Sequence, residues 1–191
     1  MEDLKHFMVK GSPLLADMAF VTERYGTEGL KQVLDAMPPE HAEVYRKKPL
    51  VSSWYSMELR IQILLAIDKL WAKGDPDYFF EIGYHQADYN LKKYYKSFMR
   101  MIGTKRIMSM SPLYWRLIYK TSRIEMVAEQ NRAEIEVFDY PKVGEYNCHV
   151  IRGYIHRTAE IAGDKRSNVT SEEVACLNRG DSNCRFVLTW T

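Results

Sequence analysis

The sequence predicts an α+β protein in which a helical N-terminal part is followed by an antiparallel β-sheet covered by helices. Two observations predict this class. Apolar residues recur at helical spacing through the first two thirds of the chain, and beyond about residue 120 they alternate with polar residues, as in strands. A length of 191 residues suits one domain with a substantial core. We therefore predict a single domain over residues 1–191, mainly helical at 1–120 and sheet-forming at 121–191.

The helical part is predicted to contain five helices. Ser12 and Pro13 begin the first and Gly26 closes it, because serine favours the N-cap and glycine the position after a helix. Pro38 stops the second, since proline lacks the N–H that a helix interior requires. The third has the widest apolar face. The predicted bounds are 13–25, 30–37, 56–71, 77–101 and 111–119.

The C-terminal part is predicted to fold as a β-hairpin, a helix and a second β-hairpin. Apolar and polar residues alternate over 124–128 and 133–137, with Gln130 and Asn131 at the turn. A helix is expected from about Glu145 to Ala162, ended by glycine at 163. The remaining two strands are expected at 168–177 and 183–190.

Composition and charge exclude several classes of protein. The chain is 46% hydrophobic and 27% charged, which is typical of a globular protein and not of a disordered one. A net charge of +2, with lysine and arginine scattered, argues against nucleic acid as a partner. No apolar run approaches the roughly 18 residues of a membrane span, and the N-terminus lacks the basic start of a signal peptide. We therefore predict a cytoplasmic protein with no membrane span and with reduced thiols.

Two of the three cysteines have the spacing of a metal site. Cys176 and Cys184 flank a turn at Gly180 and Asp181, so we expect them to face each other across a hairpin, about 5 Å apart at Cβ. One tetrahedral ion can bridge that separation, and Cys148 would supply a third thiolate. The alternative is that all three cysteines are small buried apolar residues.

The C-terminal quarter resembles the 4-vinyl reductase (4VR) domain family. The resemblance rests on the run from Cys148 to Tyr154 and on the pattern Glu173-x-x-Cys176-x(7)-Cys184, over about 45 residues. It implies a bacterial small-molecule-binding regulatory module, with a fold shared with TRAPP vesicle-tethering subunits and haem nitric-oxide sensor domains. In the phenol-responsive activators of this family, the domain binds an aromatic effector and a zinc ion. Because this chain shows no ATPase or DNA-binding domain, we expect its output to pass through a separate regulatory protein.

The resemblance implies Cys148, Glu173, Cys176 and Cys184 as the metal ligands. Four protein ligands leave no open coordination position, which indicates a structural zinc rather than a catalytic one. Strand geometry leaves Glu172 as an alternative, because residues three apart on a regular strand point to opposite faces and Glu173 therefore requires a β-bulge. The negative charge of the site is expected to be offset by Arg152, Arg179 and Arg185.

A sensor needs a largely apolar cavity with a few polar groups. His85 is the candidate partner for a phenolic or carboxylic ligand. The run Tyr119-x-Thr121-x-Arg123 resembles the Tyr-x-Ser-x-Arg triplet that holds haem propionates in the nitric-oxide sensors, but a threonine replaces the serine and no histidine stands at the proximal position. The candidate ligand-binding residues are Tyr84, His85, Tyr89, Trp115 and Tyr119, with a place in the core as the alternative for each.

We therefore predict a non-enzymatic sensor that binds an apolar or aromatic ligand and forms a homodimer. The sequence contains no Gly-rich nucleotide loop, nucleophile elbow or His-Glu-x-x-His run that would support catalysis. The alternatives are a TRAPP-like interaction adaptor, an accessory reductase of tetrapyrrole metabolism and a haem sensor.

Overall fold

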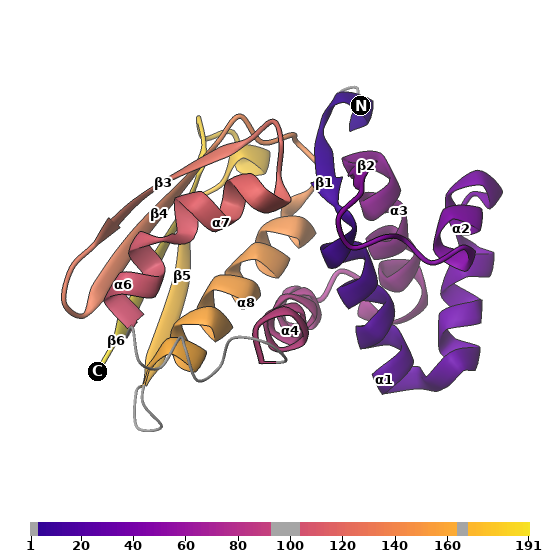
Figure 1. Ribbon diagram of the computed structural model, residues 1–191, viewed down its shortest axis with the longest axis horizontal. Coiled ribbons are helices and arrows are strands. Elements are labelled where there is room, and N and C mark those ends of the chain that lie inside the picture. Colours follow the sequence, from indigo (N-terminus) through magenta and orange to yellow (C-terminus); the bar gives the residue numbers. More distant parts are fainter. Residues whose placement is uncertain (1–3, 93–103, 164–167) are drawn as a thin grey trace.

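The computed structural model describes residues 4–92, 104–163 and 168–191. It confirms the predicted α+β class. Figure 1 shows helices α1, α2 and α3 on one side, the four-stranded sheet on the other, and α4 and α8 between them. Strand β1 and the C-terminal end of the chain lie on opposite sides of the molecule, and the helices α4 and α8 lie between them.

The N-terminal half follows the predicted helices with two additions. The predicted helices at 13–25 and 30–37 form one kinked helix, because Gly26 adopts φ 72°, where a side chain would be strained. Pro39 then starts a short helix that sequence analysis missed, and a two-stranded sheet was also missed because each of its strands has three residues. The elements are η1 (Leu4–His6), β1 (Met8–Lys10), α1 (Gly11–Ala36), α2 (Pro39–Arg46), β2 (Trp54–Ser56), α3 (Met57–Ile67) and η2 (Asp68–Ala72).

The middle of the chain is helical as predicted, in shorter pieces. Ser56 caps α3, its hydroxyl accepting a hydrogen bond from the Leu59 N–H, and Asp75 caps the next helix in the same way through Asp77 N–H. The predicted helix at 77–101 is described as far as Lys92, and its last nine positions lie outside the described residues. The elements are α4 (Pro76–Ala87), η3 (Asp88–Lys92), α6 (Thr104–Ser109) and α7 (Ser111–Ile118), of which α6 was not predicted.

The sheet has the predicted strands in an order that joins the two hairpins. The strands are β3 (Arg123–Ala128), β4 (Arg132–Phe138), β5 (Val169–Ala175) and β6 (Cys184–Trp190), all antiparallel in the order β3-β4-β6-β5. One face is buried, through residues such as Ile135, Phe186 and Leu188. Helices α6, α7 and α8 (Glu145–Ala162) contact the sheet on that face, and a short turn, η4 (Leu177–Arg179), links β5 to β6.

Helices α4 and α8 cross at two glycines. A Cβ atom on Gly83 would lie 1.9 Å from the Val150 carbonyl oxygen, and one on Gly153 would lie 2.0 Å from that of Phe80. Because neither position has room for a side chain, the two backbones approach closely, as glycine allows. This crossing fixes where the first turns of α8 lie between the two halves.

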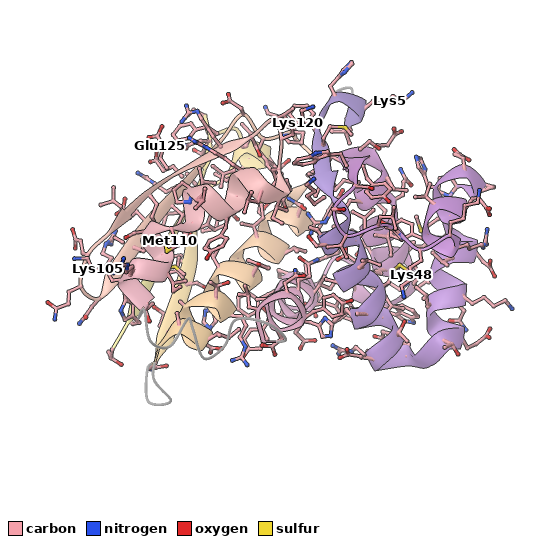
Figure 2. All side chains as sticks on the ribbon, viewed as in Figure 1. Lys5, Lys48, Lys105, Met110, Lys120 and Glu125 are labelled. Atoms are coloured by element: carbon pink, nitrogen blue, oxygen red, sulfur yellow. The ribbon has the colours of Figure 1, made fainter. Side chains whose placement is uncertain are left out.

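Side chains fill the space between the ribbons, and the labelled Lys5, Lys48, Lys105, Lys120 and Glu125 lie at the surface in Figure 2. Among the described helices, none combines the length and the apolar character needed to span a bilayer.

Candidate functional site

The three cysteines and one glutamate gather at the end of the sheet. Cys148 lies on α8, Cys176 directly follows β5 and Cys184 begins β6. The Cys148 Sγ lies 3.6 Å from that of Cys176 and 3.7 Å from that of Cys184. One ligand atom from each of the three cysteines and from Glu173 fits within 4.8 Å of the others, and all three cysteines are buried. The predicted residues therefore do meet in space.

A β-bulge brings Glu173 rather than Glu172 into this cluster. The pairing of β5 with β6 changes register between Glu173 and Ala175, which turns Glu173 to the side that Cys176 occupies. The Glu173 side chain is 4% exposed, and its Oε1 atom is buried with no hydrogen-bond partner among the described residues. Glu172 stays on the regular strand opposite Val187 and is exposed.

Hydrogen bonding within the cluster favours the thiolate form of one cysteine, Cys184. A hydrogen bond from the Cys148 thiol lowers the pKa of Cys184 to about 7, and the same bond raises the pKa of Cys148. Of the three arginines predicted to offset the cluster, Arg179 contacts it, with Nη1 at 3.3 Å from a Glu173 oxygen. The other two contact different groups: Arg152 lies over the Phe80 ring and Arg185 lies near Glu136.

The five predicted ligand-binding residues fall into two separate groups. Trp115 and Tyr119 lie at the end of α7 with their rings tilted by 32° and their ring centroids 4.3 Å apart. Tyr84, His85 and Tyr89 belong to α4 and η3, which pack on α8 and α1 rather than on the sheet. The Tyr84 hydroxyl donates to Glu160 and His85 Nε2 contacts Glu23, whereas His85 Nδ1 is buried with no hydrogen-bond partner among the described residues.

A buried charged network near Trp115 and Tyr119 was missed by sequence analysis. The Arg60 side chain is 1% exposed and Asp17 is fully buried, with Arg60 Nε 3.5 Å from Asp17 Oδ2. The guanidinium donates to the Tyr119 hydroxyl at 3.1 Å, to Asn147 Oδ1 at 3.4 Å and to Gln86 Oε1 at 3.5 Å. The sequence held one indication of this network, since Asp17 and Arg60 each lie within an apolar helical run. A charged side chain in such a run is rarely buried without a partner.

Comparison with known proteins shows the fold. No family model and no curated protein matches the chain, so the 4VR family stays a prediction. Solved structures match over 95% of the chain. They include an H-NOX protein from S. oneidensis in its Fe(II)NO state (11% identity, TM-score 0.72, 99% of that chain) and Fe(II) unliganded H-NOX from K. algicida (12%, 0.69, 96%). An oxygen-binding H-NOX domain related to soluble guanylate cyclases also matches (12%, 0.65, 95%). The chain therefore has the H-NOX fold, which confirms the predicted likeness to nitric-oxide sensors.

These comparisons correct the predicted cofactor. The matching structures are of H-NOX proteins in Fe(II) states and include a study of heme distortion, so the group that those proteins bind is haem, and the predicted structural zinc is wrong. The physical reason for the error is that cysteine spacing predicts where thiols meet and does not identify an ion. Buried thiols also partner one another, as Cys148 does with Cys176 and Cys184.

The residues of this chain do not fit a haem at the predicted triplet. Tyr119 is buried and its hydroxyl accepts from Arg60, whereas Arg123 is exposed, pairs with Glu125 and lies 3.4 Å from Asp139. The two ends of the triplet therefore point to different environments and cannot hold one anionic group together.

The histidines do not supply the missing axial ligand. All five lie in the described part of the chain, and none of them is buried. His85, the nearest candidate upstream of the triplet, contacts Glu23 through Nε2, and His156 lies between Ser171 and Glu160. Because neither the triplet nor a buried histidine offers a fixed position for haem, haem is not assigned to this chain.

Proposed function

We propose that this chain is a small-molecule sensor domain that acts by binding rather than by catalysis. The observation that carries the proposal is the H-NOX fold over 95% of the chain, because the matching structures include domains that bind nitric oxide or oxygen. Since neither the predicted triplet nor the histidines fit haem, we propose an apolar or aromatic organic ligand instead.

The aromatic residues at the end of α7 are the proposed walls of the ligand site. Trp115, Tyr119 and Tyr140 have ring centroids 4.3 to 6.0 Å apart and lie where the helical half meets the sheet half. Tyr140 also lines an open pocket of about 410 Å³, together with Phe7 and the polar residues His6, Thr121 and Asp139. A cavity lined by aromatic rings with a few polar groups is typical of small-molecule sites.

Two measurements on the purified chain test the proposal. Denaturing extraction followed by mass spectrometry detects a bound organic molecule, and a thermal-shift screen of aromatic and aliphatic compounds detects stabilising ligands. We expect a rise in melting temperature of several degrees for at least one class, and a smaller rise in Trp115→Ala than in the exposed control Leu113→Ala. A Soret absorption band in the purified protein would contradict the proposal of an organic ligand.

We propose in addition that Cys148, Glu173, Cys176 and Cys184 form one ligand set for a metal ion, without assigning the element. The support is their convergence within 4.8 Å and the buried, unpartnered oxygen of Glu173. Thiolates favour soft transition metals. Elemental analysis of wild type, Glu173→Gln and the matched control Glu172→Gln is the test. We expect bound metal in wild type and control, and a loss in Glu173→Gln. Metal-free wild type contradicts the proposal.

An enzymatic alternative rests on three side chains that contact one another in series, Ser171, His156 and Glu160. Ser171 Oγ lies 3.0 Å from His156 Nδ1, and His156 Nε2 lies 3.3 Å from Glu160, which is the order of a nucleophile, a base and an orienting carboxylate. Glu160 also accepts from Tyr84 and Arg157, which favours a structural role. Labelling of Ser171 by a fluorophosphonate probe would favour a hydrolase, and we expect none.

A further inference from the structure

Arg60 places a permanent positive charge in the middle of the protein. Its side chain is 1% exposed on α3, and Asp17 on α1, the carboxylate beside it, is 0% exposed. A buried guanidinium has five N–H groups and no access to bulk water, so each N–H requires an acceptor from protein or ligand. The partners of Arg60 therefore determine what this interior can bind.

The protein surrounds Arg60 with acceptors but does not saturate it. Its three hydrogen bonds go to the neutral oxygens of Tyr119, Asn147 and Gln86 at 3.1 to 3.5 Å. Hydrogen bonds from a cation to a carboxylate are commonly about 2.7–2.9 Å long. Arg60 Nε and Asp17 Oδ2 face each other 3.5 Å apart as a buried ion pair, and neither atom has a hydrogen bond among the described residues. The guanidinium is therefore held by four partners at 3.1 to 3.5 Å, and each of these contacts is longer than the usual hydrogen bond from a cation to a carboxylate.

The network connects to the aromatic walls and to the pocket. The Asn147 amide, which accepts from Arg60, donates through Nδ2 to the Tyr140 hydroxyl at 2.9 Å. Tyr140 in turn lines the pocket of about 410 Å³ and is itself buried. Tyr140 thus belongs to the pocket lining and, through its hydroxyl, to the hydrogen-bonded groups around Arg60.

We propose that the ligand of this domain is a carboxylic acid, whose carboxylate pairs with Arg60 and whose apolar body packs against Trp115, Tyr119 and Tyr140. The inference rests on the proposed sensor function and gives the chemical class of its ligand. A guanidinium presents parallel N–H groups that match the two oxygens of a carboxylate, which an alcohol or an amine does not offer.

Asp17 keeps the charges balanced when such a ligand enters. Burial raises the pKa of Asp17 to about 6, with Arg60 on α3 and His85 on α4 acting in the opposite direction. A second carboxylate beside Arg60 favours the protonated form of Asp17 further, because like charges at one site oppose ionisation. Arg60 then pairs with the ligand, and Asp17 remains hydrogen-bonded to Gln86 as a neutral acid.

Matched acid and alcohol probes test the inference. The pairs are 4-phenylbutyrate with 4-phenylbutan-1-ol, octanoate with octan-1-ol and 1-naphthoate with 1-naphthol, measured by thermal shift and calorimetry on the full chain. We expect at least one acid to bind ten or more times more tightly than its alcohol. The Arg60→Lys variant keeps the charge but loses the paired N–H groups, and we expect it to remove most of this preference. Arg152→Lys, outside the network, is the matched control.

A second variant keeps the inference testable if Arg60→Lys does not fold. The double variant Asp17→Asn with Arg60→Met removes both charges together, and circular dichroism shows whether it is folded. If the acid preference is absent in wild type, or persists in both variants, the carboxylate inference is overturned. In that case, binding of the alcohols would leave the sensor proposal standing. If no compound of either series stabilises the wild type, both proposals fail.

Discussion

The thiol cluster and the Arg60 network lie side by side and differ in how the chain builds them. Cys148, Cys176 and Cys184 come from 37 successive positions, and the last two flank one turn. The Arg60 contacts span sequence separations of 26 to 87 residues and join α1, α3, α4, α8 and the end of α7. A site made by one hairpin and the neighbouring helix can therefore be predicted from the spacing of its residues in the sequence. A site made by five elements cannot be predicted in this way.

Helix α8 belongs to both regions through consecutive residues. Asn147 faces Arg60 and Cys148 faces the other thiols. Neighbouring residues on a helix point about 100° apart, so one turn can serve two sites. A displacement of α8 is expected to disturb both regions, whereas changes within one region should leave the other intact.

Arg60→Met is expected to have the largest effect, because it leaves the fully buried Asp17 without its cation. Removing one partner of a buried ion pair costs about 3–5 kcal/mol. Urea denaturation measures the loss in unfolding free energy. The double variant with Asp17→Asn should recover most of it, and a double variant less stable than Arg60→Met would contradict a buried pair.

Gly153→Ala is expected to disturb both regions together. The added Cβ would lie 2.0 Å from the Phe80 carbonyl oxygen, so α8 must move. We expect a loss of about 2–3 kcal/mol, near the upper end of overpacking costs. Thr158→Ala, also on α8, is the control. Equal unfolding free energies for Gly153→Ala and the control would show that the crossing tolerates a side chain.

Acid pH should change the stability of the Arg60 network through the protonation of Asp17. Burial raises the pKa of Asp17 from 3.8 to about 6, so the folded state holds this proton more tightly than the unfolded state. The stability that the proton contributes is present below about pH 4 and is lost as pH rises to about 6. Relative to Asp17→Asn, wild type should lose on the order of 2 kcal/mol across this window. Parallel pH profiles for the two proteins would show that Asp17 does not titrate there.

Cys184→Ala is expected to have the smallest effect in metal-free protein. It removes one buried sulfur atom from the cluster and leaves the hairpin backbone unchanged, so we expect a loss of about 1 kcal/mol. The measurement is unfolding free energy in the presence of a chelator. A loss in unfolding free energy as large as that of Arg60→Met would contradict the expectation that the thiol cluster contributes less to stability than the Arg60 network.

Several elements could be predicted because their signals are local. The helix at 145–162 was predicted with the bounds that the structure shows, since Gly163 ends its amphipathic pattern, and the β3–β4 hairpin followed from alternation. Helices α2 and α6 were missed because eight- and six-residue helices carry little periodicity. The choice of Glu173 over Glu172 came from the family resemblance, and the β-bulge supplies the geometry that it required.

The sequence by itself determined the α+β class, the main helices and strands and the meeting of three cysteines at one turn, because periodicity and short loops act over a few residues. The tertiary structure alone decided that Arg60 and Asp17 pair in the interior, that the two hairpins join through β4 and β6, and that the predicted aromatic residues form two groups. These outcomes depend on how distant faces pack, and an apolar stripe in the sequence does not state which partner will cover it.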